Sequence, residues 1–179
     1  MFQGGDRYLA DALRCLQRTW WRPEVGIVVA GIIADGCEPV FATSTSAGPG
    51  CWYHAERNAL TNFQRLYGTP APGSLVVSSL SPCLRPSVSR AGESCTQLLL
   101  DHGLTTVHAG IVDPEQTSAG TQAYAKQGLD VTLTFDPKLV TACRELLNLF
   151  SQYGNRINFD LIDIKASLGE EFAARLVTN

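Results

Sequence analysis

The sequence has no cluster of positive charge and little charge of either sign. Lysine and arginine together number 14 of the 179 residues and aspartate and glutamate 17, which gives a formal net charge of −3. The basic residues are scattered, whereas a surface that binds nucleic acid gathers them on one face. A polynucleotide substrate is therefore disfavoured, and a small-molecule substrate is expected instead.

Long apolar runs are also missing. No segment approaches the roughly 20 residues that span a membrane, and the first six residues lack the charged and then apolar stretches of a signal peptide. Six cysteines could form three disulfides, but they are spread through a chain long enough to build its own core. Metal binding or burial explains them better. We expect a soluble, cytoplasmic protein with no membrane contact.

Short apolar segments and amphipathic segments alternate along the chain. Val25 to Ile33 is a continuous apolar and β-branched run, typical of a central strand covered on both faces. Asp35-Gly36 signals a turn, after which residues 39–44 can return as an antiparallel partner, with a loop over 45–53. Further strands are expected at 74–80, 107–112, 131–135 and 158–164, and helices at 6–19, 54–68, 93–102, 119–127 and 137–153. This order predicts an α/β fold with three layers, in which helices cover both faces of a mixed sheet.

A histidine, a glutamate and two cysteines form the most informative pattern. His54 and Glu56 are separated by one residue, Cys83 follows Pro82, and Cys95 lies beyond a loop. One histidine and two cysteines can supply three ligands to Zn²⁺, which leaves the open position that a catalytic zinc site requires. Each ligand lies where a helix should begin, and helix N-termini favour thiolate over thiol. We predict a zinc site made of His54, Cys83 and Cys95, with Glu56 moving protons at the open position.

Simpler interpretations exist for each of these residues. His54, Cys83 and Cys95 could be a core histidine and two buried thiols, and Glu56 could be a carboxylate that stabilises a helix N-terminus. Arg85 and Arg90 could bind a phosphate of the substrate, because guanidinium groups match phosphate oxygens, or they could be solvated loop residues. The aromatic residues before His54 could stack on a flat ring or belong to the core.

The motifs resemble those of the cytidine-deaminase-like superfamily. The chain has His54-x-Glu56 and Pro82-Cys83, which match the pattern of zinc deaminases. Within the superfamily it looks most like the deaminase domain of the bifunctional riboflavin-biosynthesis deaminase/reductase. That domain also has a Pro-x-Val-Gly strand start, here residues 23–26, an Asp-Pro pair after a strand, here residues 113–114, and a long gap between its zinc cysteines.

The resemblance covers nearly the whole chain and carries several expectations. It implies a cytidine-deaminase-like sandwich that hydrolyses an aminopyrimidine, such as diaminohydroxyphosphoribosylaminopyrimidine, with Zn²⁺ as cofactor. It also implies a deaminase domain over residues 1–153, an extension over 154–179 that is similar to the start of a reductase domain, and no NADPH-dependent step. Oligomerisation is common in this superfamily, so a homo-oligomer is expected.

Several positions depart from the family pattern. Arg22 stands where asparagine is usual, Ser81 stands where glutamate precedes Pro-Cys, and the loop from Leu84 to Ser94 is different. These positions shape the pocket in relatives, so the resemblance supports the chemistry better than the substrate. Three alternatives therefore stay open: a deaminase of another nucleobase, nucleoside or specialised metabolite, a deaminase that edits polynucleotides, and an inactive structural partner that kept the fold.

Overall fold

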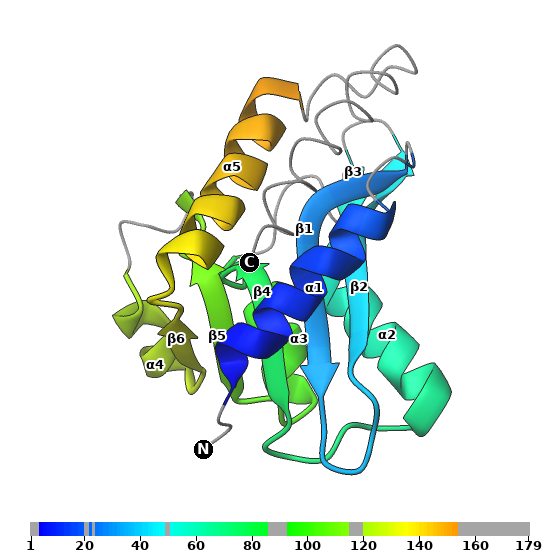
Figure 1. Cartoon of the computed structure of the whole chain (residues 1–179). Helices are drawn as coiled ribbons and strands as arrows, with labels where there is room; N and C mark the ends of the chain where they lie inside the picture. The colour runs from blue at the N-terminus through cyan, green and yellow to red at the C-terminus, as the bar shows by residue number, and fades with distance from the viewer. Residues whose placement is uncertain are drawn as a thin grey trace.

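The computed structural model describes residues 4–19, 22, 24–48, 51–85, 93–114 and 120–153. Its centre is a six-stranded sheet with the strand order β3-β2-β1-β4-β5-β6 (Figure 1). Strands β4, β5 and β6 run parallel, and the pairs β1·β2, β1·β4 and β2·β3 are antiparallel. The sheet is therefore mixed, as predicted. The strands are β1 (Val25–Ile33), β2 (Val40–Gly48), β3 (Cys51–Tyr53), β4 (Leu75–Leu80), β5 (Thr106–Ile111) and β6 (Asp130–Leu133).

Helices cover both faces of this sheet, which confirms the three-layer prediction. Figure 1 shows α1 and α5 in front of the sheet and α2 and α3 behind it. The helices are α1 (Gly5–Thr19), α2 (Ala55–Tyr67), α3 (Cys95–Asp101), α4 (Gln122–Gln127) and α5 (Pro137–Tyr153). Among the described residues, no helix combines the length and apolar character that crossing a membrane requires.

Each face of the sheet has its own hydrophobic core, and β1 contributes to both. Val29 packs into the first core with residues of α1 and α5, whereas its neighbour Ala30 packs into the second core with residues of α2, α3 and α4. Successive strand residues point to opposite faces, so a strand buried on both must be apolar throughout. This explains the continuous apolar run of β1 and its central place in the sheet.

Some local expectations were wrong. The segment 45–53 is not simply a loop, because β2 continues to Gly48 and β3 pairs with it, Thr45 opposite Tyr53 and Ser46 opposite Trp52. Threonine and aromatic residues are compatible with strands, and pairing with β2 holds the three residues of β3 in the sheet. Leu66, near the end of α2, is 59% exposed and does not belong to the buried face of that helix. The strand expected at 158–164, and the whole extension over 154–179, lie outside the described residues.

The start of α1 is joined to the sheet through Asp6. The aspartate at the start of the expected helix over 6–19 is a residue type that caps helices, but the helix begins at Gly5 and Asp6 lies in its first turn. There its carboxylate contacts the Nε2 atom of His108 at 2.8 Å. The Nδ1 atom of His108 lies 3.0 Å from the hydroxyl of Thr132. His108 therefore joins the start of α1 to β5 and β6 as a structural residue.

Gly110 allows α5 to pack closely on β5. A Cβ atom at this position would collide with the Sγ atom of Cys143 and would lie 2.8 Å from the carbonyl oxygen of Ser79. We expect Gly110→Ala to lower the free energy of unfolding by about 1–3 kcal/mol, the usual cost of overpacking a core. Thermal unfolding of the purified variant measures this effect. In a Cys143→Ala background the loss of stability caused by Gly110→Ala should be smaller but not zero, since the contact with the backbone of Ser79 remains. A Gly110→Ala variant as stable as the wild type would contradict the packing argument.

Candidate metal centre

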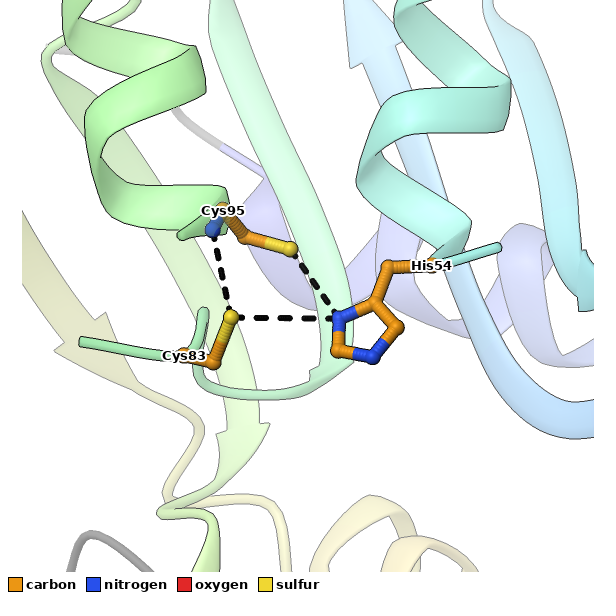
Figure 2. A group of neighbouring side chains, drawn as sticks. All are labelled: His54, Cys83 and Cys95. Carbon is orange, nitrogen blue, oxygen red and sulfur yellow. Dashed lines mark hydrogen bonds between the residues drawn. The ribbon is translucent and has the colours of Figure 1, made fainter. Parts of the chain in front are cut away.

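Three separate elements supply the candidate zinc ligands. His54 is the N-cap residue of α2, with the extended backbone angles φ −74° and ψ 152°. Cys83 lies in the segment that follows β4, and Cys95 is the first residue of α3. Figure 2 shows the three side chains pointing toward one another from these positions. The structure therefore brings together all three residues that the sequence pattern selected.

The distances within the cluster suit a zinc ion. The Nδ1 atom of His54 lies 3.1 Å from the Sγ atom of Cys95 and 3.9 Å from that of Cys83 (Figure 2). All three possible ligand atoms lie within 4.8 Å of one another. A tetrahedral zinc ion with ordinary Zn–S and Zn–N bonds holds its ligand atoms roughly 3.5–3.8 Å apart. Small side-chain adjustments are therefore enough to complete the coordination.

Backbone groups of α3 hold Cys83 in the cluster. The N–H of Cys95 donates to the Sγ atom of Cys83 at 3.1 Å, and the N–H of Thr96 donates to the carbonyl oxygen of Cys83 at 3.2 Å. Ser94 caps the helix, and its hydroxyl accepts a bond from the N–H of Gln97 at 3.2 Å. An N–H bond to sulfur favours the thiolate, which is the form that binds a metal. Helix α3 therefore supplies one ligand and fixes another.

Glu56 lies beside this cluster and is almost fully buried. Its side chain is in the first turn of α2 and 3% exposed. The Sγ atom of Cys95 lies 3.5 Å from Oε2, and the hydroxyl of Ser78, on β4, lies 3.4 Å from Oε1. The pKa of Glu56 is raised above its ordinary value, mainly by burial. The charge of His54 lowers this pKa, and the charge of Cys83 raises it. A carboxyl group with a raised pKa beside three metal ligands is suited to both accepting and delivering a proton.

The raised pKa of Glu56 predicts a pH dependence of stability. Between the ordinary carboxyl pKa and the raised one, the folded chain binds a proton that the unfolded chain has released. The free energy of unfolding therefore falls as pH rises through this window. Since glutamine is neutral throughout, we expect Glu56→Gln to raise the melting temperature of the metal-free protein at pH 7–8 and to flatten its decline with pH.

Thermal melts of metal-free protein from pH 4 to pH 9 measure this difference. Glu93→Gln is a matched control, because Glu93 is exposed and contacts only the partly exposed Arg57 at 3.1 Å among its described interactions. It should follow the wild-type curve closely, since exposed ion pairs contribute little. A Glu56→Gln variant that melts below the wild type at pH 8 would contradict the expected cost of burying this carboxylate.

The residues proposed for substrate contacts are less well defined. Arg85 is exposed two positions after Cys83, and Arg90 lies outside the described residues. Tyr53, directly before His54, is 54% exposed, and Trp52 is partly buried. Phosphate binding by the arginines and stacking by the aromatic residues therefore stay predictions.

Sequence reasoning missed three hydroxyl groups near the site. Ser78 contacts Glu56, while Ser81 and Tyr124 contact each other with 2.8 Å between their oxygens. Ser78 is fully buried and Ser81 is 3% exposed. The serine pair Ser78-Ser79 inside the buried strand β4 is a signal that could have pointed to this position, because buried hydroxyls need partners. Tyr124 carries no such signal, since its partners are distant in sequence.

The fold is similar to those of two solved deaminase structures. The first is a diaminohydroxyphosphoribosylaminopyrimidine deaminase/5-amino-6-(5-phosphoribosylamino)uracil reductase from Thermotoga maritima, with a TM-score of 0.57, 21% identity and 83% of this chain covered. The second is the dCMP deaminase of the cyanophage S-TIM5 in complex with dCMP and dUMP, with a TM-score of 0.50, 16% identity and 75% of this chain covered. The match spans 42% of the Thermotoga chain and 99% of the phage chain.

The sequence itself matches no protein-family model and no curated protein. Because the identities to both solved structures are low, the similarity is one of fold. The chain has the cytidine-deaminase-like fold, as the sequence resemblance predicted, and it spans less than half the length of the bifunctional Thermotoga protein.

Proposed function

We propose that this chain, with its cytidine-deaminase-like fold, is a zinc-dependent hydrolytic deaminase of an aminopyrimidine. The observation that carries the proposal is the convergence of the Nδ1 atom of His54 and the thiols of Cys83 and Cys95, with the carboxylate of Glu56 beside them. Among the described residues this group offers three ligands, and a structural zinc site would use four. Three ligands and an adjacent buried carboxylate are the parts that metal-assisted hydrolysis needs.

Zinc, when bound, lowers the pKa of a water molecule at its open position to roughly 7. The residues of the chain then carry the proton transfers. Glu56 accepts one proton of the attacking water and delivers it to the ring nitrogen. It then accepts the second proton from the added hydroxyl group, as the carbonyl forms and the C–N bond breaks, and delivers it to the amino group, which leaves as ammonia. Burial of Glu56 supports this cycle, because it raises the pKa of the carboxyl group and thereby makes its carboxylate a better proton acceptor. The hydroxyl of Ser78 lies 3.4 Å both from Oε1 of Glu56 and from the carbonyl oxygen of Val29, so it is a polar neighbour of one carboxylate oxygen.

The substrate proposed is diaminohydroxyphosphoribosylaminopyrimidine or a related pyrimidine. The name of the Thermotoga protein, the motif resemblance and the two arginines of the loop after Cys83 support this choice, since a phosphorylated substrate would need cationic partners. Because the loop from Leu84 to Ser94 differs from the family pattern, related pyrimidines should be tested together with this compound. A homo-oligomer of the chain stays a prediction.

Ammonia release from a panel of aminopyrimidines tests the proposal. The panel includes free bases, nucleosides and phosphorylated compounds, and each is incubated with zinc-loaded wild type and with Glu56→Ala. Turnover of one compound by the wild type, abolished by the substitution, supports the deaminase. Stoichiometric zinc binding without turnover across the panel would favour the structural partner instead, and salt-dependent binding of single strands would favour the polynucleotide-editing alternative.

A further inference from the structure

Tyr124 is a fully buried tyrosine that reaches the backbone next to a candidate metal ligand. It belongs to the six-residue helix α4 and has 0% exposure. Its hydroxyl donates to the carbonyl oxygen of Pro82 at 2.8 Å. Pro82 directly precedes Cys83, so this bond fixes the peptide group that leads into the ligand. The ring itself packs in the hydrophobic core that α2 and α3 share.

Ser81 completes a chain of hydrogen bonds around this tyrosine. The hydroxyl oxygens of Ser81 and Tyr124 lie 2.8 Å apart, and the N–H of Asp113 donates to the Ser81 hydroxyl at 3.0 Å. The Tyr124 hydroxyl donates its only proton to the carbonyl oxygen of Pro82. In the contact between the two hydroxyls, Ser81 is therefore the donor and Tyr124 the acceptor. The backbone N–H of Ser81 also donates to the carbonyl oxygen of Ile111 at 2.9 Å. The end of β5 is thereby linked through two buried hydroxyls to the peptide before Cys83.

Cys83 is consequently fixed from two directions. Helix α3 holds it through the N–H groups of Cys95 and Thr96, and α4 holds the preceding carbonyl through Tyr124. We propose that Tyr124 and Ser81 are positioning residues that hold Cys83 at the distance from His54 and Cys95 that zinc requires. This inference rests on the proposed function, because it assigns the two hydroxyls to the metal site of that function.

The chemistry of the core supports a specific role for the hydroxyl of Tyr124. A phenylalanine would fill the same apolar volume without the cost of burying a polar group, and a buried hydroxyl repays that cost only where it finds partners. Here both partners belong to the Ser81-Pro82 segment. In this network the proton of Ser81 is donated to Tyr124, so the serine hydroxyl is itself part of the buried hydrogen-bond chain.

Zinc binding by Tyr124→Phe and Ser81→Ala tests the inference. Partners around metal ligands typically contribute about 10–100-fold to metal affinity, and we expect each variant to bind zinc about tenfold more weakly than the wild type. Competition with a chromophoric chelator measures the affinity. In cobalt-substituted protein, the thiolate-to-cobalt absorption band should shift or weaken, which reports the geometry of Cys83 independently of activity.

Ser74→Ala is the matched control. Ser74 is 3% exposed and donates one hydrogen bond to the carbonyl oxygen of Ala71 at 2.7 Å, just before β4 begins and far along that strand from Ser81. It should lower stability as the loss of a buried hydrogen bond does, but it should leave zinc affinity and the cobalt spectrum unchanged.

Wild-type zinc affinity and an unchanged cobalt spectrum in Tyr124→Phe would overturn the positioning role while leaving the deaminase proposal in place. A wild-type protein that binds no zinc would overturn both. Should Tyr124→Phe fail to fold, the smaller change Ser81→Ala decides the question by the same two measurements.

Discussion

Glutamine in place of Glu56 is expected to lower the rate of ammonia release by about 10²–10⁴-fold, the usual contribution of a positioned acid or base. The amide has nearly the same shape and can still contact Ser78, but it can neither accept the proton of water nor protonate the departing amine. Zinc content should stay at the wild-type level, because Glu56 is not among the three candidate ligands. The measurement is kcat on the compound that the substrate panel identifies, together with metal content from elemental analysis.

Glu93→Gln serves as the control for this experiment. It makes the same chemical change at an exposed glutamate near the start of α3, and its activity should stay within a factor of about two, since an exposed ion pair contributes at most ~1 kcal/mol. If Glu56→Gln kept more than a tenth of the wild-type kcat, the proton transfers would have to be assigned to another group.

Replacing a candidate zinc ligand should lower the rate of ammonia release about as much as Glu56→Gln does, because the metal is lost. We expect Cys83→Ser and Cys95→Ser to bind zinc far more weakly and to lose activity with it, because serine replaces the thiolate by a poor ligand for this ion. The wild type should gain about 2.7 kcal/mol of stability at a zinc concentration 100 times its dissociation constant, a gain that both variants should lack. Thermal melts with and without zinc, after removal of metal by a chelator, measure the difference.

Cys143→Ala is the matched control for the ligand variants. Cys143 is also a buried cysteine, 1% exposed, and burial raises its pKa to about 12. It packs in the core between α5 and the sheet, away from the cluster. The variant should be less stable in the absence of zinc and yet show the wild-type gain on zinc addition. An equal gain in Cys83→Ser would exclude that residue from the metal site.

The fold was predictable from sequence where one local signal dominated. The continuous apolar run predicted β1 as a buried central strand. The glycine at position 68 predicted the end of α2, and in the structure it has φ +82°, a conformation that favours glycine. The register of β1 was not predictable, because a strand that is apolar at nearly every position has no alternation to fix which residue faces which side. Strand β3 was missed because its stability comes from pairing with β2 and not from its own three residues.

In the candidate site, too, residues with a local sequence signal were predictable and residues without one were not. His54, Glu56 and Cys83 could be identified because each belongs to a short motif. His54 and Cys95 lie at helix starts, as expected, but Cys83 does not, because the segment after β4 that contains it is not helical. The contact of Tyr124 with Pro82 joins residues 42 positions apart, and neither carries a pattern that points to the other. The exact substrate could not be derived from the sequence, since the residues that depart from the family pattern lie mainly in the loop after Cys83, and local sequence alone does not say which side chains of a loop contact a ligand.

The two hydrophobic cores place all of the proposed chemistry in one layer of the molecule. His54 and Glu56 come from α2, Cys95 from α3 and Tyr124 from α4, which together cover one face of the sheet, whereas α1 and α5 cover the other. A label, an affinity handle or an extensive redesign of surface positions can therefore be introduced on α1 and α5 without touching a reacting group. The opposite layer is the scaffold on which this protein can be altered while its reaction is kept.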